Sequence, residues 1–212
     1  MKLLALDSAF ASVSACVWAD GKVRAARHRA LAHGHAEALL PLIEATLAEA
    51  GLRALDLTRI AVTLGPGHFT GLRAGLAAAQ GLIVATGAEA VGIDCFAVVA
   101  SAMPEPRAGE RRLIAFDSKR DEAFVKLDGE APFAAAPAGF DAPGDAFLIG
   151  GDLAAAFART LGGKARVAES PPLPRADLLA PLAARATPVV RLEPLYIHPP
   201  AITAAKTGPQ PK

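Results

Sequence analysis

The sequence predicts an α/β protein built from two tandem copies of one unit, and repeated segments carry this prediction. Leu-Leu-Ala-Leu-Asp-Ser at residues 3–8 returns as Leu-Ile-Ala-Phe-Asp-Ser at residues 113–118. In each copy a second β-like run follows and ends at Asp-Gly, first at residues 20–21 and then at residues 128–129. Asp-Gly is typical of tight hairpin turns, whose central residues need positive φ. Helical patterns between the copies indicate a duplicated α/β architecture with helical crossovers.

The first helix is predicted from His35 to Ala50, with Gly51 as its stop. Apolar residues recur there at helical spacing, namely Leu39, Leu40, Ile43 and Leu47. Pro41 lies inside this stretch. Because a proline removes a backbone hydrogen bond, we expect the helix to bend there or to begin late.

A short buried strand is predicted from Arg59 to Leu64, followed by a turn and a second helix. The turn is Gly-Pro-Gly-His-Phe at residues 65–69. Thr70 is placed to cap a helix that runs to Thr86. This strand, turn and helix complete the first unit.

A proline-rich joint at residues 103–109 separates the two predicted units. The division gives an N-terminal domain at residues 1–102 and a smaller C-terminal domain at residues 110–200. The last residues, 201–212, are expected to form a mobile tail.

The second unit is reduced relative to the first. Residues 131–144 are rich in Pro, Ala and Gly and show no periodicity. Strand and helix patterns return only at residues 145–161 and 176–186. We therefore expect fewer regular elements in the second copy than in the first.

Composition places the chain among globular proteins. Of its 212 residues, 52% are hydrophobic and 20% are charged, which argues against disorder. The nearly uncharged run at residues 74–88 is shorter than the ~20 residues that a bilayer demands, and the apolar start before Asp7 is too short for a signal peptide. Cys16 and Cys95 are expected as free thiols in a reducing compartment. We expect a cytoplasmic protein that does not contact a membrane.

The net charge is +1, and Lys and Arg are spread along the chain. A protein that binds nucleic acid on its own usually carries a concentrated basic patch, which this distribution does not predict. If RNA is involved, we expect a partner protein to hold it.

Asp7 and Asp117 end the two repeated strands, the position at which actin-like ATPases and sugar kinases place acidic residues around a metal-bound phosphate. The loops at residues 8–12 and 118–122 lack the glycines that let backbone amides approach phosphates. We favour the alternative that both aspartates bond backbone amides at strand ends. An ATP-dependent phosphotransferase using Asp7 and Asp117 is kept as the alternative function.

Two further features could bind ligands but have simpler explanations. His33-Gly34-His35 lacks the carboxylates or cysteines of a metal site, so we expect His35 to begin the first helix and bond locally. The amides of residues 65–71 face a helix N-terminus and could hold an anion. Tight packing of strand against helix is the interpretation that we favour there.

The second helix gives the strongest physical argument for function. One apolar stripe comprises Leu72, Leu76, Ala79 and Ile83, and the adjacent one comprises Gly71, Gly75, Ala78 and Leu82. Arg73 and Gln80 are its only strongly polar residues, so the helix must be covered nearly all round. A central core helix is one explanation. We favour a protein interface shared with the first helix, where Arg73 would need a carboxylate or carbonyl partner.

Several segments resemble the motifs of the TsaB (YeaZ) family, in the family's order. Residues 65–75 resemble its Gly-Pro-Gly-Ser-Phe-Thr-Gly-x-Arg-x-Gly signature, with His68 at the usual serine position. Residues 4–8 resemble the opening strand of the family, and residues 35–41 resemble its His-Ser-Glu-x-Leu-Leu-Pro helix start. Residues 117–124 are similar to its Asp-Ala-Arg-Arg-x-Glu-Val-Tyr segment, and residues 194–196 are similar to its closing Pro-x-Tyr.

The resemblance implies an actin-like duplicated fold with a reduced second domain, and a role in adding threonylcarbamoyl to adenosine in tRNA. Family members lack the catalytic metal site of their paralogue TsaD, pair with it or with themselves through the first two helices, and assemble with the ATPase TsaE. The chain is therefore expected to be a non-catalytic subunit without cofactor or metal. The expected interface residues are Leu39, Leu40, Ile43, Leu47, Gly71, Arg73, Gly75, Ala78 and Leu82, and the structural motif residues are Asp7, Ser8, Gly65, Pro66, Gly67, Phe69, Thr70 and Asp117.

Overall fold

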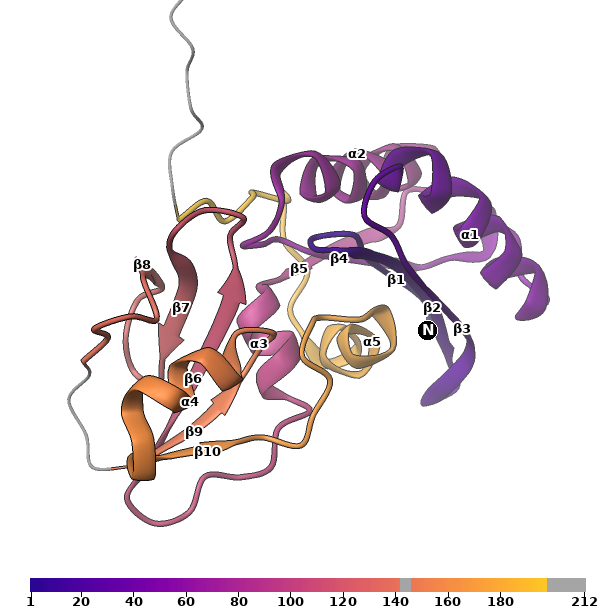
Figure 1. Cartoon of the computed structure of the whole chain (residues 1–212). Coiled ribbons are helices and arrows are strands. Elements are labelled where there is room, and N and C mark those ends of the chain that lie inside the picture. The colour runs from indigo at the N-terminus through magenta and orange to yellow at the C-terminus, as the bar shows by residue number, and fades with distance from the viewer. Residues whose placement is uncertain (142–145, 198–212) are drawn as a thin grey trace, which may run out of the picture.

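The computed structural model describes residues 1–141 and 146–197, and within them the strands form two mixed sheets (Figure 1). The first sheet has the order β3-β2-β1-β4-β5. Its strands are β1 (Lys2–Asp7), β2 (Ser12–Ala19), β3 (Lys22–Ala30), β4 (Arg59–Thr63) and β5 (Glu89–Ile93). β2 is antiparallel to β1 and β3, whereas β1, β4 and β5 are parallel.

The second sheet repeats this arrangement in the order β10-β9-β6-β7-β8. Its strands are β6 (Glu110–Asp117), β7 (Ala123–Leu127), β8 (Phe133–Ala135), β9 (Ala146–Gly150) and β10 (Ala165–Val167). β6 occupies the place of β1 in the second sheet. β1 lies between the antiparallel β2 and the parallel β4, and β6 likewise lies between the antiparallel β7 and the parallel β9. The predicted duplicated α/β fold is therefore confirmed.

Helices cover both faces of the first sheet. α1 (His35–Glu49) and α2 (Phe69–Thr86) lie on one face, and α5 (Ala176–Arg185) lies on the other (Figure 1). The short α4 (Ala154–Leu161) packs against the second sheet, whereas the short α3 (Cys95–Ala100) contacts both α5 and β6. Two 3-10 turns occupy Ala54–Asp56 and Gly162–Lys164. Between β8 and β9, the described residues 136–141 contain no counterpart of α1.

Coverage on both faces explains why β1 is a continuous apolar run. Leu4 and Leu6 belong to the core beneath α1 and α2, whereas Leu3 and Ala5 belong to the core that contacts α5. No helix of residues 1–141 and 146–197 has the length and hydrophobicity needed to cross a bilayer.

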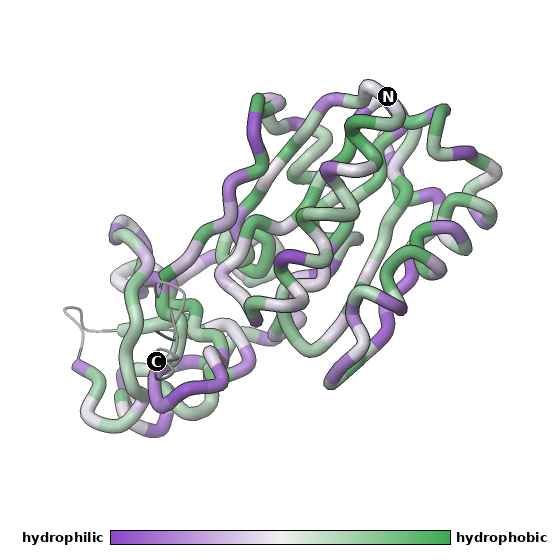
Figure 2. Tube along the Cα trace, turned by 90° about the horizontal axis from the view of Figure 1, so that it is seen from above, coloured by the Kyte–Doolittle hydropathy of each residue, from purple (hydrophilic) through white to green (hydrophobic). Residues whose placement is uncertain are grey.

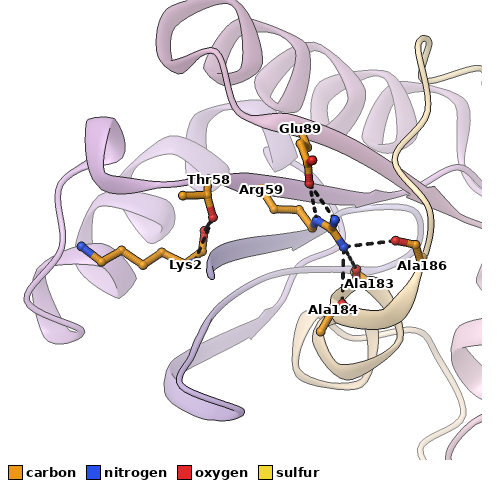
Figure 3. A network of polar contacts seen from close by, with 7 residues as sticks. All are labelled: Lys2, Thr58, Arg59, Glu89, Ala183, Ala184 and Ala186. Atoms are coloured by element: carbon orange, nitrogen blue, oxygen red, sulfur yellow. Dashed lines mark hydrogen bonds and ion pairs between the residues drawn. The ribbon is translucent and has the colours of Figure 1, made fainter.

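Arg59 on β4 fastens α5 to the first sheet (Figure 3). Its guanidinium donates to the carbonyl oxygens of Ala183 and Ala186 at 3.0 and 3.1 Å, and it is paired with Glu89 at 2.6 Å. These carbonyls lie at the C-terminus of α5, where the helix leaves acceptors unpaired and favours a cation. α5 follows the second sheet in sequence but is held on the first sheet. The division into two domains at residues 103–109 therefore stays a prediction.

The two units also share an aromatic core. The ring of Phe116 on β6 lies 4.8 Å from that of Phe10, which follows β1, and 5.1 Å from that of Phe96 on α3. Cys16 and Cys95 are both buried as free thiols.

Three local expectations can be compared with the backbone. α1 begins at His35 and runs through Pro41, so it does not begin late. Thr70 as the cap of α2 is wrong: His68 is the N-cap residue, because its carbonyl accepts the first helical bond, from the Leu72 N–H at 2.9 Å, while its own backbone stays extended. The predicted tail, residues 201–212, lies outside the described residues.

The two Asp-Gly turns differ. Asp20 and Gly21 both have positive φ, as expected, at 53° and 76°. In the fully described second turn only Gly129 does, at 82°. This connection spans residues 128–132, so it is longer than the two-residue hairpin turn that requires both angles.

Candidate functional site

α1 and α2 lie side by side (Figures 1 and 2). A groove runs between them. Its volume is about 450 Å³. The lining residues are small or aliphatic throughout: Ala36, Leu39, Leu40, Ala74, Ala77, Ala78, Gly81 and Leu82. Figure 2, seen from above, shows that α2 is mostly hydrophobic along its length.

Six of the nine predicted interface residues, those other than the two glycines and Arg73, divide into two groups. Leu39, Ile43 and Leu47 are 1%, 3% and 6% exposed and pack in the core of this chain. Leu40 is 55% exposed, and Ala78 and Leu82 are half-buried beside it in the groove. For the first group, burial within the chain already accounts for the apolar side chains.

Gly71 and Gly75 are required for packing inside the chain. A Cβ on Gly71 would lie 2.3 Å from the Ser8 carbonyl oxygen, and one on Gly75 would lie 2.5 Å from Ser8 Oγ. Ser8 Oγ in turn donates a hydrogen bond of 2.8 Å to the Gly71 carbonyl. The glycines of the motif therefore let α2 approach the end of β1, which agrees with the packing interpretation of residues 65–71.

The stripe that faces solvent was missed by the sequence analysis. It comprises Ala74, Ala77, Gly81 and Val84, of which Val84 is 87% exposed. A Cβ on Gly81 would meet no atom within 4 Å. The signal was available, because these small residues recur at the helical spacing i, i+3, i+7 and i+10.

Arg73, the charged residue of α2, is held by aromatic residues of its own chain. Its guanidinium lies 3.6 Å from the centroid of the Phe69 ring, and Nε donates to Tyr196 Oη at 3.3 Å. The Leu195 N–H bonds the Leu64 carbonyl at 2.7 Å, which brings the closing segment against the glycine-rich turn. Within this chain Tyr196 and Phe69 thus contact the guanidinium, and the expected carboxylate or carbonyl partner at an interface stays a prediction.

Asp7 is sealed inside the protein. Its side chain is 0% exposed; Oδ1 accepts hydrogen bonds from Thr63 Oγ1 at 2.7 Å and from the Ala9 N–H at 3.4 Å. Within the described residues Oδ2 has no hydrogen-bond partner. Burial raises the pKa of Asp7 to about 7, against the smaller opposing effect of the two hydrogen bonds.

Asp117 occupies the equivalent strand end in a different environment. Its carboxylate contacts Lys119 Nζ at 2.6 Å and accepts from the Lys119 N–H at 2.7 Å. Burial alone would raise its pKa, but these two bonds to Lys119 hold the pKa below the ordinary value. The Asp117 N–H donates to Asp152 at 2.9 Å. Both aspartates thus bond backbone amides, as the favoured interpretation expects.

A second cleft, of about 700 Å³, opens at the N-termini of α1 and α2. His35 anchors one wall, because its Nε2 donates to the Phe10 carbonyl at 2.7 Å. His68 lines the other wall; burial lowers its pKa, although a bond to the Asp117 backbone opposes this effect. Across residues 1–141 and 146–197 there is no group of three or more potential metal ligands. His35 begins α1 as expected, but its bond is to a distant residue rather than a local one.

Comparisons with known proteins give a family model, relatives in sequence and similar solved structures. The family model described as TsaD, tRNA N6-adenosine threonylcarbamoyltransferase, matches residues 29–161. The Escherichia coli tRNA threonylcarbamoyladenosine biosynthesis protein TsaB is 30% identical over 124 residues, which are 58% of this chain and 53% of that protein. An uncharacterized protein of Mycobacterium tuberculosis is 35% identical over 159 residues, covering 70% of this chain and 71% of the relative. YeaZ from Pseudomonas aeruginosa has a TM-score of 0.77 at 25% identity, over 92% of this chain and 99% of that one.

The repeated sheets and the helix pair define a duplicated α/β protein of the actin-like class. The chain belongs to the TsaB/YeaZ family, a relationship carried by the match to residues 29–161 and by relatives along most of its length. The aligned region spans about half of E. coli TsaB, at 53% of that protein. The expected family and fold class are confirmed.

Proposed function

We propose that this chain is a non-catalytic subunit in the biosynthesis of threonylcarbamoyladenosine in tRNA, and that it pairs with a TsaD-type catalytic paralogue through the groove between α1 and α2. The groove is the observation that carries the proposal. It is lined by aliphatic side chains and by Gly81, which leaves room for a neighbouring helix to approach closely. The relatives named for tRNA threonylcarbamoyladenosine biosynthesis supply the pathway.

The composition of the solvent-facing side of α2 supports the proposal that a protein partner covers it. Arg73 is the single charged residue of this fully described helix. Val84 of α2 and Leu40 of α1, which lines the groove, expose large apolar side chains. Uncharged helical faces of this kind are covered in most soluble proteins. The same surface could pair two copies of this chain. By the family resemblance, a TsaE-type ATPase would join the complete assembly.

A charge placed in the groove should abolish pairing without unfolding the chain. Ala77 is exposed on α2, so Ala77→Glu adds a carboxylate that only a partner would bury. Burial of an unpaired charge is expected to weaken pairing roughly tenfold or more. Sedimentation velocity of the purified chain mixed with the TsaD-type paralogue measures this effect.

Ala155→Glu is the matched control, because Ala155 is also exposed on a helix, α4, far from the groove in sequence and outside its lining. This control should pair like the unaltered chain. Equal pairing by Ala77→Glu and Ala155→Glu would place the interface elsewhere.

The second candidate function, a phosphotransferase that uses Asp7 and Asp117, finds no support in the geometry. Asp7 is fully buried and bonded to Thr63, so it presents no oxygen to a nucleotide in this conformation. Calorimetric titration with ATP and magnesium should give no heat that depends on Asp7. Binding that disappears in Asp7→Asn, with the fold retained, would favour the phosphotransferase.

A further inference from the structure

The edge strand β3 concentrates positive charge on the surface of the first unit. Eight of its nine residues are exposed, and Ala25 is the buried exception. The strand carries Lys22, Arg24, Arg27 and Arg29 and no acidic residue. It also forms one border of the first sheet, where one side of its backbone has no neighbouring strand.

This strand carries a formal charge of +4, whereas the rest of the chain sums to −3. The chain has 22 Lys and Arg against 21 Asp and Glu, so without the four cations of β3 it would have 18 against 21. Between Asp20 and Glu37 there is no acidic residue at all. The even spread of charge along the sequence therefore conceals a local excess that the hairpin places on one edge.

Neighbouring carboxylates neutralise this excess only in part. Arg24 pairs with Asp20, and Arg27 pairs with Glu49 at 2.8 Å. Both side chains of the second pair are about half exposed, at 47% and 49%, so the guanidinium can exchange partners at little cost. Within the described residues Lys22 and Arg29 form no ion pair with a carboxylate.

The strand register aligns two of the guanidinium groups. Arg27 is opposite Ala15 and Arg29 is opposite Val13, and both of these β2 residues belong to the core beneath α1. Arg27 and Arg29 therefore leave the sheet on the α1 side, separated by two strand residues or roughly 7 Å. Such a row can contact successive groups of an extended polyanion.

We propose that β3 is a contact surface for the phosphate backbone of RNA, with Arg27 and Arg29 at its centre. Charged residues also protect sheet edges from aggregation, but that role does not require two guanidinium groups aligned on one face of the strand. A membrane surface would be matched by apolar side chains for insertion, and Val23, 41% exposed, is the single large aliphatic residue of the strand. The choice of RNA over another polyanion rests on the proposed function in tRNA modification.

The test is a fluorescence anisotropy titration of labelled tRNA with the full chain alone, at several salt concentrations. The double variant Arg27→Gln/Arg29→Gln should bind at least about tenfold more weakly at low salt. Its plot of log K against log salt should fall less steeply, with a slope about 1.5 closer to zero. The matched control Arg159→Gln/Lys164→Gln removes two exposed cations from the second unit. It should bind within about twofold of the unaltered chain.

An unchanged affinity and salt slope in the double variant would overturn the proposal. An equal loss in the control would also overturn it, because net charge rather than β3 would then set the affinity. Binding through Arg27 and Arg29 to phosphatidylserine vesicles but not to tRNA would overturn the choice of RNA. Because the titration uses the chain alone, it is independent of pairing with the catalytic paralogue, whose failure would appear in the sedimentation experiment instead.

Discussion

Asp7 carries a carboxyl group in a place that favours its neutral form. It is 0% exposed, and the described structure provides no partner for Oδ2. Burial raises its pKa from 3.8 to about 7. The unfolded chain releases the proton near pH 4, whereas the folded chain keeps it until about pH 7. Folding stability linked to this group therefore falls as the pH rises between these values and stays low above them.

Asp7→Asn should remove this pH dependence, because the amide keeps an acceptor for Thr63 and has no charge to bury. Relative to the unaltered chain, the variant should gain stability progressively from pH 4 to pH 7, by up to roughly 4 kcal/mol. Urea denaturation at a series of pH values measures the difference. Asp121→Asn, at an exposed position, is the control. A constant difference between Asp7→Asn and the unaltered chain over this range would contradict the account of Asp7.

Two glycines of α2 should respond to alanine in opposite directions. Gly75→Ala places a Cβ 2.5 Å from Ser8 Oγ and is expected to destabilise the chain by about 1–3 kcal/mol. Gly81→Ala meets open space and should stabilise it by about 0.5–1 kcal/mol, because alanine favours the helix.

The pair of alanine variants is compared by thermal or urea denaturation of the chain alone. If the groove admits a helix of a partner, Gly81→Ala should also weaken pairing while it stabilises the monomer. The same sign of the stability change in both variants would contradict the packing described for α2.

At the scale of the elements, Arg59 links α5 to the first sheet. Arg59 is 13% exposed and donates to carbonyl oxygens at the end of this helix. Arg59→Ala leaves these acceptors without the guanidinium and should lower the free energy of unfolding by about 1.5–3 kcal/mol.

Arg53→Ala is a suitable control for Arg59→Ala, since the side chain of Arg53 is 81% exposed. Its expected effect is within about 0.5 kcal/mol. Denaturation monitored by circular dichroism compares the two variants. A negligible effect of Arg59→Ala would mean that apolar packing alone holds α5 on the first sheet.

Element boundaries were predictable where local patterns decide them. The periodicity of Leu39, Ile43 and Leu47 gave α1, and Gly51 marked its end. Thr70 was misplaced because the start of α2 depends on a bond from the His68 N–H to the Ala9 carbonyl, a contact between segments distant in sequence. Local propensity contains no information on such a contact.

At the scale of the whole molecule, the duplication could be predicted because the repeated segments that end in Asp-Ser mark β1 and β6, which hold equivalent places in the two sheets. The docking of α5 on the first sheet could not be predicted, since its Ala- and Leu-rich sequence fits either unit. Contacts between distant segments also decide which residues form the candidate site. Apolar stripes on α2 were visible, but which stripe faces the core depends on Ser8 lying against Gly71 and Gly75.

The central claim, a subunit that acts by pairing, is tested most directly by reconstituting threonylcarbamoyl transfer to tRNA with the other proteins of the pathway from the same organism, including the TsaD- and TsaE-type partners. The account predicts that transfer requires this chain, that Ala155→Glu supports it, and that Ala77→Glu does not. Full transfer without the chain, with its folded state verified, would contradict the account.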